Sequence, residues 1–188
     1  MIIIIDNYDS FTQNLVQCIG ELGYEIHIAR NNKILIKDIK KINPTHIILS
    51  PGPGKPEHSK ICLKIIKIFS SQIPILGICL GHQSIGYYYK GNIQQMNRPI
   101  HSKISKIINN QQDLFKNISN AFEGIRYHSL IINNFEFPIH LKITAWTSDG
   151  IIMGCKHIIN KKVRGVQFHP ESLWTKEGKS ILKKFLLF

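Results

Sequence analysis

The sequence predicts an α/β fold in which an open, mostly parallel twisted sheet has helices on both faces and a small antiparallel extension. Short runs that are apolar at successive positions, such as residues 2–5 and 75–78, are typical of central parallel strands covered on both sides. They alternate with stretches whose apolar residues recur at helical spacing, which favours the α/β class. No linker, repeat or low-complexity tract interrupts the 188 residues, so we expect a single domain spanning residues 1–188.

The first half of the chain supplies the parallel part of the predicted sheet. The isoleucine run at residues 2–5 forms the first strand, and a polar loop then leads into a helix for which Asp9 or Ser10 is the expected N-cap. Apolar residues three and four positions apart continue that helix. The elements expected next are a strand at 24–29, a helix at 36–42, a strand at 46–49, a helix at 57–69 and a strand at 75–78.

The second half begins with a helix near His82 and then changes its pattern. Residues 93–108 and 126–152 have the composition of shorter strands joined by turns, which predicts the antiparallel extension. A further buried strand is expected at 163–168. The apolar positions within residues 175–188 recur at helical spacing and predict a closing helix.

The charge of the chain is strongly positive, with 24 Lys and Arg residues against 12 Asp and Glu residues, which gives a formal net charge of +12. Such an excess is one sign of nucleic-acid binding. Here the lysines are spread along the chain and are not interleaved with aromatic residues in a stacking pattern. A solvated basic surface is therefore the favoured interpretation, and no nucleic-acid partner is expected.

No membrane association is expected either. No apolar run approaches transmembrane length, and the N-terminal isoleucines lack a basic flank and reach Asp6 too early for a signal peptide. The cysteines at positions 18, 62, 79 and 155 are far apart and show no disulfide framework, which favours a reducing compartment. We therefore expect a cytoplasmic protein, or one of the plastid stroma if the gene lies in the organelle.

The first candidate for chemistry is Cys79, at the end of the strand predicted at 75–78. Gly77 and Gly81 lie two residues to either side, which is the spacing of a nucleophile elbow with cysteine in place of serine. Glycines are expected there because the turn is sharp and neighbouring backbone comes close. The N-terminus of the following helix would stabilise negative charge on the sulfur. A buried, unreactive cysteine is the alternative, since that is the commonest state of a free cysteine.

A candidate base for this thiol lies near the C-terminus. His169 and Glu171 stand two residues apart, and in an extended segment such residues point to the same side. The carboxylate can then hold one imidazole nitrogen while the other nitrogen faces the thiol, which is the arrangement that a thiol nucleophile needs. Pro170 between them restricts the backbone.

Five segments together resemble the class I, or triad-type, glutamine amidotransferases, and they cover essentially the whole chain in order. Two of them, residues 77–83 and 165–172, carry the candidate nucleophile and base. The other three are Asp6-Asn7-Tyr8-Asp9-Ser10-Phe11-Thr12, Ser50-Pro51-Gly52-Pro53-Gly54 and Arg126-Tyr127-His128-Ser129-Leu130. These three narrow the resemblance to the glutaminase component of anthranilate synthase and its close relative in 4-aminobenzoate synthesis. The fold implied is a flavodoxin-like sheet.

The resemblance implies a role for each residue of a catalytic triad. Cys79 would be the nucleophile, His169 the base and acid, and Glu171 the carboxylate that orients the imidazole. The residues implied for glutamine binding are Gly52, Pro53, Gly54, Gln83, Ser129 and Leu130.

Two backbone N–H groups are expected to form the oxyanion hole. One belongs to Leu80, directly after the nucleophile. The other belongs to Gly52, because Pro51 and Pro53 have no N–H to donate. An ordinary Pro/Gly turn would be the better interpretation of this loop if it stood alone.

The activity implied is hydrolysis of L-glutamine, with delivery of the ammonia to a chorismate-using synthase large subunit that makes anthranilate. The same chemistry could instead serve 4-amino-4-deoxychorismate synthase. The chain has no segment large enough for the chorismate chemistry, so we expect a separate partner polypeptide. No cofactor is expected in this chain, whereas the partner is expected to need Mg²⁺. No metal site is expected, because Cys79-x-x-His82 and Cys155-x-His157 lack the paired spacing of zinc ligands.

Two other classes of function remain as alternatives. A free-standing γ-glutamyl hydrolase or thiol peptidase would use the same fold without a partner, and a basic binding module would use it as a scaffold.

The sequence also departs from the family pattern at Lys90 and Ser102, which stand where glycines are usual. These departures bear on local turns and on the subunit interface, and not on the chemistry.

Overall fold

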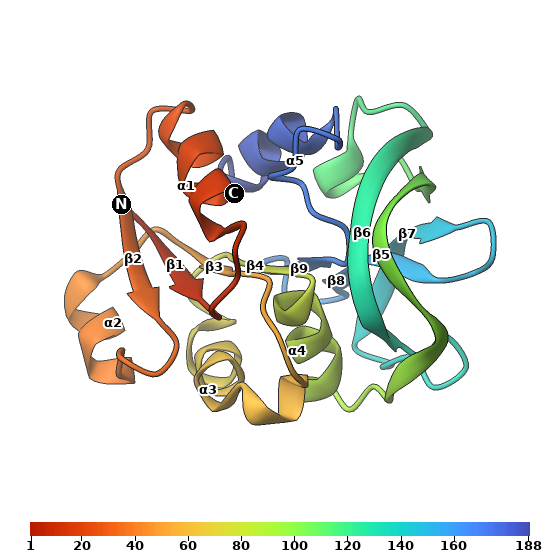
Figure 1. Cartoon of the computed structure of the whole chain (residues 1–188). Coiled ribbons are helices and arrows are strands. Elements are labelled where there is room, and N and C mark those ends of the chain that lie inside the picture. The colour runs from red at the N-terminus through yellow and green to blue at the C-terminus, as the bar shows by residue number, and fades with distance from the viewer.

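The computed structural model describes the backbone of all 188 residues and the side chains of residues 1–96 and 103–188. Its centre is one nine-stranded sheet with the strand order β2-β1-β3-β4-β9-β8-β7-β5-β6. Figure 1 shows this sheet running across the molecule, with helices on both faces of its N-terminal part. This architecture confirms the predicted fold class. Ser102 lies among the residues whose side chains are not described.

The first five strands of that order are parallel, and they form where short apolar runs occur in the sequence. Their bounds are Ile26–Arg30 for β2, Ile2–Asp6 for β1, His46–Leu49 for β3, Ile75–Ile78 for β4 and Val163–Val166 for β9. The register places Ile4 of β1 opposite Ile28 of β2 and Ile48 of β3. Strands β3, β4 and β9 are buried throughout, as expected for parallel strands covered on both faces.

Two apolar cores flank the parallel strands, because successive side chains of a strand point to opposite faces. Ile2 and Ile4 of β1 pack into one core, together with residues of α1 (Thr12–Gly20) and α5 (Gly178–Phe185). Ile3 and Ile5 pack into the other, against α2 (Ile36–Ile42), α3 (Lys60–Phe69) and α4 (Leu80–Tyr88). Figure 1 shows the first pair of helices above the sheet and the other three below it.

The antiparallel extension continues the same sheet beyond β9. Its strands are β5 (Ile93–Asn109), β6 (Ala121–Ile132), β7 (Leu141–Thr147) and β8 (Ile152–His157). Strand β8 pairs antiparallel with β9, and β7, β5 and β6 follow, each antiparallel to its neighbour. This arrangement brings β6, which carries residues 126–130, toward the end of the parallel part.

The expected N-cap of the first helix is wrong. Phe11 occupies the N-cap of α1 and makes no side-chain capping bond. Asp9 Oδ2 instead accepts a hydrogen bond from the Phe11 N–H at 2.7 Å, within the loop. The loop is organised from its start by Asp6, whose Oδ1 atom accepts from the Tyr8 N–H at 2.9 Å and from the Thr12 hydroxyl at 2.9 Å. Side chain to backbone bonds of this kind compete with helix capping.

The helix expected at 57–69 is divided. Pro56–His58 forms a short 3₁₀ helix, and α3 begins only at Lys60. A second 3₁₀ helix, Asp113–Phe115, lies between β5 and β6. Among the described residues, no helix is both long and apolar enough to cross a membrane.

Candidate active site

Cys79 lies in the sharp turn between β4 and α4, with φ 51° and ψ −101°. A Cβ atom on Gly77 would lie 2.4 Å from the carbonyl carbon and oxygen of Gly81, and one on Gly81 would lie 2.4 Å from the Leu49 carbonyl oxygen. Both positions therefore accept only glycine, which confirms the reason given for them from the sequence. A positive φ at a non-glycine residue is strained, and such strain is found at functional sites.

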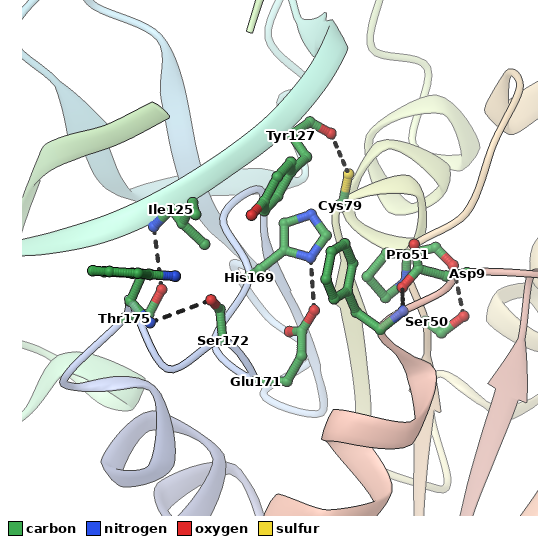
Figure 2. A network of polar contacts seen from close by, with 12 residues as sticks. Asp9, Ser50, Pro51, Cys79, Ile125, Tyr127, His169, Glu171, Ser172 and Thr175 are labelled. Carbon is green, nitrogen blue, oxygen red and sulfur yellow. Dashed lines mark hydrogen bonds and ion pairs between the residues drawn. The ribbon is translucent and has the colours of Figure 1, made fainter. Parts of the chain in front are cut away.

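His169 and Glu171 lie in the segment after β9 and are both buried. The His169 Nδ1 atom is 2.6 Å from Glu171 Oε1. Because the ionised carboxylate can only accept, Nδ1 carries the proton, and in the neutral ring Nε2 is left as the acceptor. Figure 2 shows the imidazole between the Glu171 carboxylate and the Cys79 sulfur. The sequence-predicted triad residues are therefore brought together in space.

The surroundings of His169 act on its pKa in opposite directions. Burial alone lowers it, because a charged imidazolium loses solvation. The nearby Cys79 thiol and the hydrogen-bonded Glu171 carboxylate outweigh this and raise the pKa of His169 well above its ordinary value. The Cys79 Sγ atom itself lies 3.9 Å from the Tyr127 carbonyl oxygen. An imidazole whose affinity for a proton is raised can accept the proton of a neighbouring thiol, which produces the nucleophilic thiolate.

Two aromatic side chains, which the sequence analysis did not assign to the site, hold the imidazole in place. The Tyr127 ring meets His169 edge-on, with centroids 5.3 Å apart. Phe11 stacks on Tyr127 at 5.3 Å and contacts His169 at 6.0 Å. Both belong to segments that carried the family resemblance, but nothing in their spacing places them beside His169. Packing against two rings restricts the imidazole to one orientation.

A pocket of about 190 Å³ opens beside the Cys79 side chain. All six residues expected to bind glutamine line it, together with two that the sequence analysis did not assign to binding, Tyr127 and His128. The complete lining is Gly52, Pro53, Gly54, Cys79, Gln83, Tyr127, His128, Ser129 and Leu130. The loop after β3, the start of α4 and the middle of β6 thus converge on the thiol.

Gln83 is held on the wall of this pocket by its amide nitrogen. Nε2 donates to the Leu130 carbonyl oxygen at 2.8 Å and to Gln167 Oε1 at 3.1 Å. Both of its N–H groups are occupied, so the Oε1 atom remains to accept a hydrogen bond from a bound molecule. Gln167 is completely buried and was not identified from the sequence, because its position between β9 and His169 resembles that of a core residue.

The other two histidines near the site are structural. Burial lowers the pKa of His82 to about 3, and its Nδ1 atom is 3.5 Å from Cys155 Sγ. Burial, followed by the charge of Arg126, lowers the pKa of His128 to about 3. Neither imidazole is suited to take up a proton at neutral pH. The described residues contain no group of three or more His, Cys, Asp and Glu side chains that could hold a metal ion.

Comparisons with known proteins agree with this geometry. The family model described as glutamine amidotransferase class-I matches residues 3–187. A protein named anthranilate synthase component 2, from Pyropia yezoensis, is 58% identical over 99% of this chain and 98% of its own. An aminodeoxychorismate/anthranilate synthase component 2 from Bacillus subtilis is 44% identical over 99% of this chain and 95% of its own.

A solved structure of a glutamine amidotransferase from Thermotoga maritima shares the fold. It has a TM-score of 0.76 at 13% identity, over 98% of this chain and 95% of that one. At this identity the likeness concerns the fold alone. The match of the family model over nearly the whole length, and the identity to the curated relatives, show the family: this chain belongs to the class I glutamine amidotransferases.

Proposed function

We propose that this chain is the glutaminase subunit of an anthranilate synthase, in which it hydrolyses L-glutamine to glutamate and ammonia. The observation that carries this proposal is the placement of Cys79 at a pocket wall with the His169–Glu171 pair beside it. A thiol, an imidazole and a buried carboxylate in this order constitute the machinery of nucleophilic acyl transfer.

The reaction begins with attack of the Cys79 thiolate on the side-chain carbonyl carbon of glutamine. The carbonyl oxygen becomes an oxyanion, and the N–H groups of Gly52 and Leu80 are the donors proposed to stabilise it. Imidazolium of His169 gives its proton to the leaving nitrogen, so that ammonia departs and a γ-glutamyl thioester remains. Water, deprotonated by the same imidazole, then attacks the thioester and releases glutamate and the thiol.

Glutamine itself would be held by the pocket walls. Gln83 Oε1 is free to accept from the α-ammonium group, since both amide N–H groups are occupied within the protein. The backbone of Ser129 and Leu130 lines the same wall and is proposed to contact the amino-acid end of the substrate. The volume of about 190 Å³ suits one small amino acid.

The ammonia is proposed to pass to a chorismate-using large subunit, which is a separate polypeptide. Support comes from the name anthranilate synthase component 2 carried by the Pyropia yezoensis relative at 58% identity. A second candidate acceptor is 4-amino-4-deoxychorismate synthase, because the Bacillus subtilis relative carries both names. We also propose that glutamine hydrolysis needs no cofactor, that the partner needs Mg²⁺, and that both work in the cytoplasm or the plastid stroma.

The test reconstitutes the complex from this chain and an anthranilate synthase large subunit, and compares glutamine with ammonium as nitrogen source. The wild-type chain should support anthranilate formation from both sources, whereas Cys79→Ser should support it from ammonium only. EDTA should stop chorismate conversion but not glutamine hydrolysis measured as glutamate release. Equal glutamine-dependent rates for wild type and Cys79→Ser would overturn the proposal. Activity confined to a 4-amino-4-deoxychorismate synthase would overturn the anthranilate assignment alone.

A further inference from the structure

Ser50, which the mechanism above does not use, lies in the loop between β3 and the pocket and is completely buried. Its hydroxyl is joined to two backbone groups. It accepts a hydrogen bond from the Asn7 N–H at 2.9 Å and donates one to the Pro51 carbonyl oxygen at 2.7 Å. A serine hydroxyl has a single proton, so the bond from Asn7 fills a lone pair and leaves that proton for Pro51.

The Pro51 carbonyl belongs to the same peptide group as the Gly52 N–H. A peptide group is planar, and the described peptide bonds are all trans, so this carbonyl and this N–H point in opposite directions. Fixing the carbonyl on Ser50 therefore fixes the N–H on the other side. Figure 2 shows the Ser50–Pro51 contact in the same view as Cys79 and His169.

Asn7 anchors this arrangement to the core of the protein. Its Nδ2 atom donates to the Ser50 carbonyl oxygen at 2.9 Å. Its Oδ1 atom accepts from Asn31 Nδ2 at 3.0 Å and from the Ser59 hydroxyl at 3.3 Å. A buried amide satisfied at both ends is rigid, because any movement leaves polar groups unpaired.

The backbone of Gly52 also packs directly against Asn7. A Cβ atom at Gly52 would lie 2.5 Å from both the Cβ and the carbonyl oxygen of Asn7. The peptide group of Gly52 thus has Asn7 on one side and the pocket on the other, with little space in which to rotate.

We infer that Ser50 is a positioning residue for catalysis, which acts by locking the Pro51–Gly52 peptide with its N–H toward the oxyanion. The inference rests on the proposed function, because it assigns no role outside glutamine hydrolysis. Rigid donors aimed at a developing charge are what makes an oxyanion hole effective, and losing one lowers kcat by about 10²–10³-fold. Losing the lock frees the donor without removing it, so a smaller effect is expected.

The experiment compares Ser50→Ala with Thr147→Val, which also removes a buried hydroxyl joined to two backbone groups, but at the end of β7, outside the pocket lining and the contacts of Asn7. We expect Ser50→Ala to lower kcat for glutamine at least about tenfold, toward the limit set by loss of a donor, with KM little changed. Thr147→Val should stay within about twofold of wild type, and Ser50→Thr, which keeps the hydroxyl, should recover most of the rate.

Two further readouts separate positioning from general damage. An aldehyde analogue of glutamine forms a thiohemiacetal that needs the oxyanion hole, so its binding should weaken in parallel with kcat/KM in Ser50→Ala. Alkylation of Cys79 by iodoacetamide is a displacement at carbon that creates no oxyanion, so its rate should not change. Unchanged kcat in Ser50→Ala, or an equal fall in the alkylation rate, would overturn the inference.

The failure of this inference can be told from failure of the proposed function. If the wild-type complex produces no glutamate from glutamine, the proposed function is wrong. If wild type is active and Ser50→Ala is equally active, only the role of Ser50 is wrong. Should Ser50→Ala fail to fold, Ser50→Cys replaces the hydroxyl with a poor hydrogen-bond donor of similar shape, and the same criteria apply to it.

Discussion

Glu171 acts on the candidate site through one short contact, since its Oε1 atom lies 2.6 Å from the Nδ1 atom of His169 and both side chains are buried. The contact selects the tautomer that leaves Nε2 free for the thiol. Together with Cys79 it also overcomes the effect of burial and raises the pKa of His169. The orienting role and the charge of Glu171 can be separated by the substitution Glu171→Gln. Its amide oxygen can still accept the hydrogen bond from His169 Nδ1, but the side chain carries no negative charge.

Glu171→Gln is expected to lower kcat by roughly 10²–10⁴-fold, the order of effect seen when a triad carboxylate is replaced by its amide. Without the negative charge, the pKa of His169 falls. The imidazolium then loses its proton at a lower pH, so the alkaline limb of the kcat/KM profile should move to lower pH.

The control for this change is Glu136→Gln, which alters an exposed carboxylate outside the pocket lining. It should leave both kcat and the pH profile unchanged. An alkaline limb that stays in place in Glu171→Gln would show that Glu171 does not set the pKa of His169.

Helix α4 contributes to the protein at both of its ends. It begins directly after the nucleophile turn, and its C-terminus is closed by a capping motif. The end of α4 has the two bonds of a Schellman motif: the Lys90 N–H donates to the Tyr87 carbonyl oxygen at 3.0 Å, and the Gly91 N–H donates to that of Gly86 at 2.8 Å. Lys90 occupies the left-handed position with φ 72°, where glycine is the usual residue.

Lys90→Gly is therefore expected to stabilise the protein by about 0.5–1 kcal/mol, because glycine removes the strain of the left-handed conformation but adds freedom to the unfolded chain. For a chain of this size that corresponds to an increase of about 1–4 °C in Tm, measurable by thermal unfolding. Lys90→Ala keeps the strain and should give no gain. A Tm for Lys90→Gly at or below that of Lys90→Ala would contradict this account of the C-cap.

Much of the fold could be predicted from local patterns in the sequence. The isoleucine-rich runs specify buried strands wherever they occur, and Gly77 and Gly81 mark a close approach that any sharp turn would require. What could not be predicted depends on contacts between distant segments. The packing of Phe11 and Tyr127 on His169 needs the pairing of β6 with β5 and of β9 with β8, and no local spacing encodes that pairing.

The same limit explains the one capping error and the unassigned residues of the site. Asp9 has the composition of an N-cap, but Asp6 organises the loop and Asp9 bonds within it. Gln167 and Ser50 have the composition of a strand end and a turn, and their importance comes from partners far away in sequence. The roles proposed for the triad, the oxyanion donors and the glutamine-binding residues remain predictions that the experiments above address.

The partner subunit is expected to control how fast this chain hydrolyses glutamine. Free ammonia is lost if hydrolysis runs without an acceptor, so we expect the isolated chain to hydrolyse glutamine slowly and the large subunit to accelerate it, on the order of 5- to 150-fold, the range typical of coupling between sites.

Trp174 follows Glu171 closely in sequence and is 63% exposed, which is unusual for a tryptophan in a monomer.

Exposed tryptophans are typical anchors of interfaces. Trp174→Ala should weaken binding of the large subunit at least about tenfold and leave the slow hydrolysis by the isolated chain unchanged, as measured by titration of glutaminase activity with partner. Phe135→Ala removes a side chain that is 99% exposed in the loop between β6 and β7, and it should change neither quantity. Equal glutaminase rates with and without the large subunit would refute the expected acceleration. Unchanged binding of the large subunit by Trp174→Ala would refute the role of Trp174 as an interface anchor.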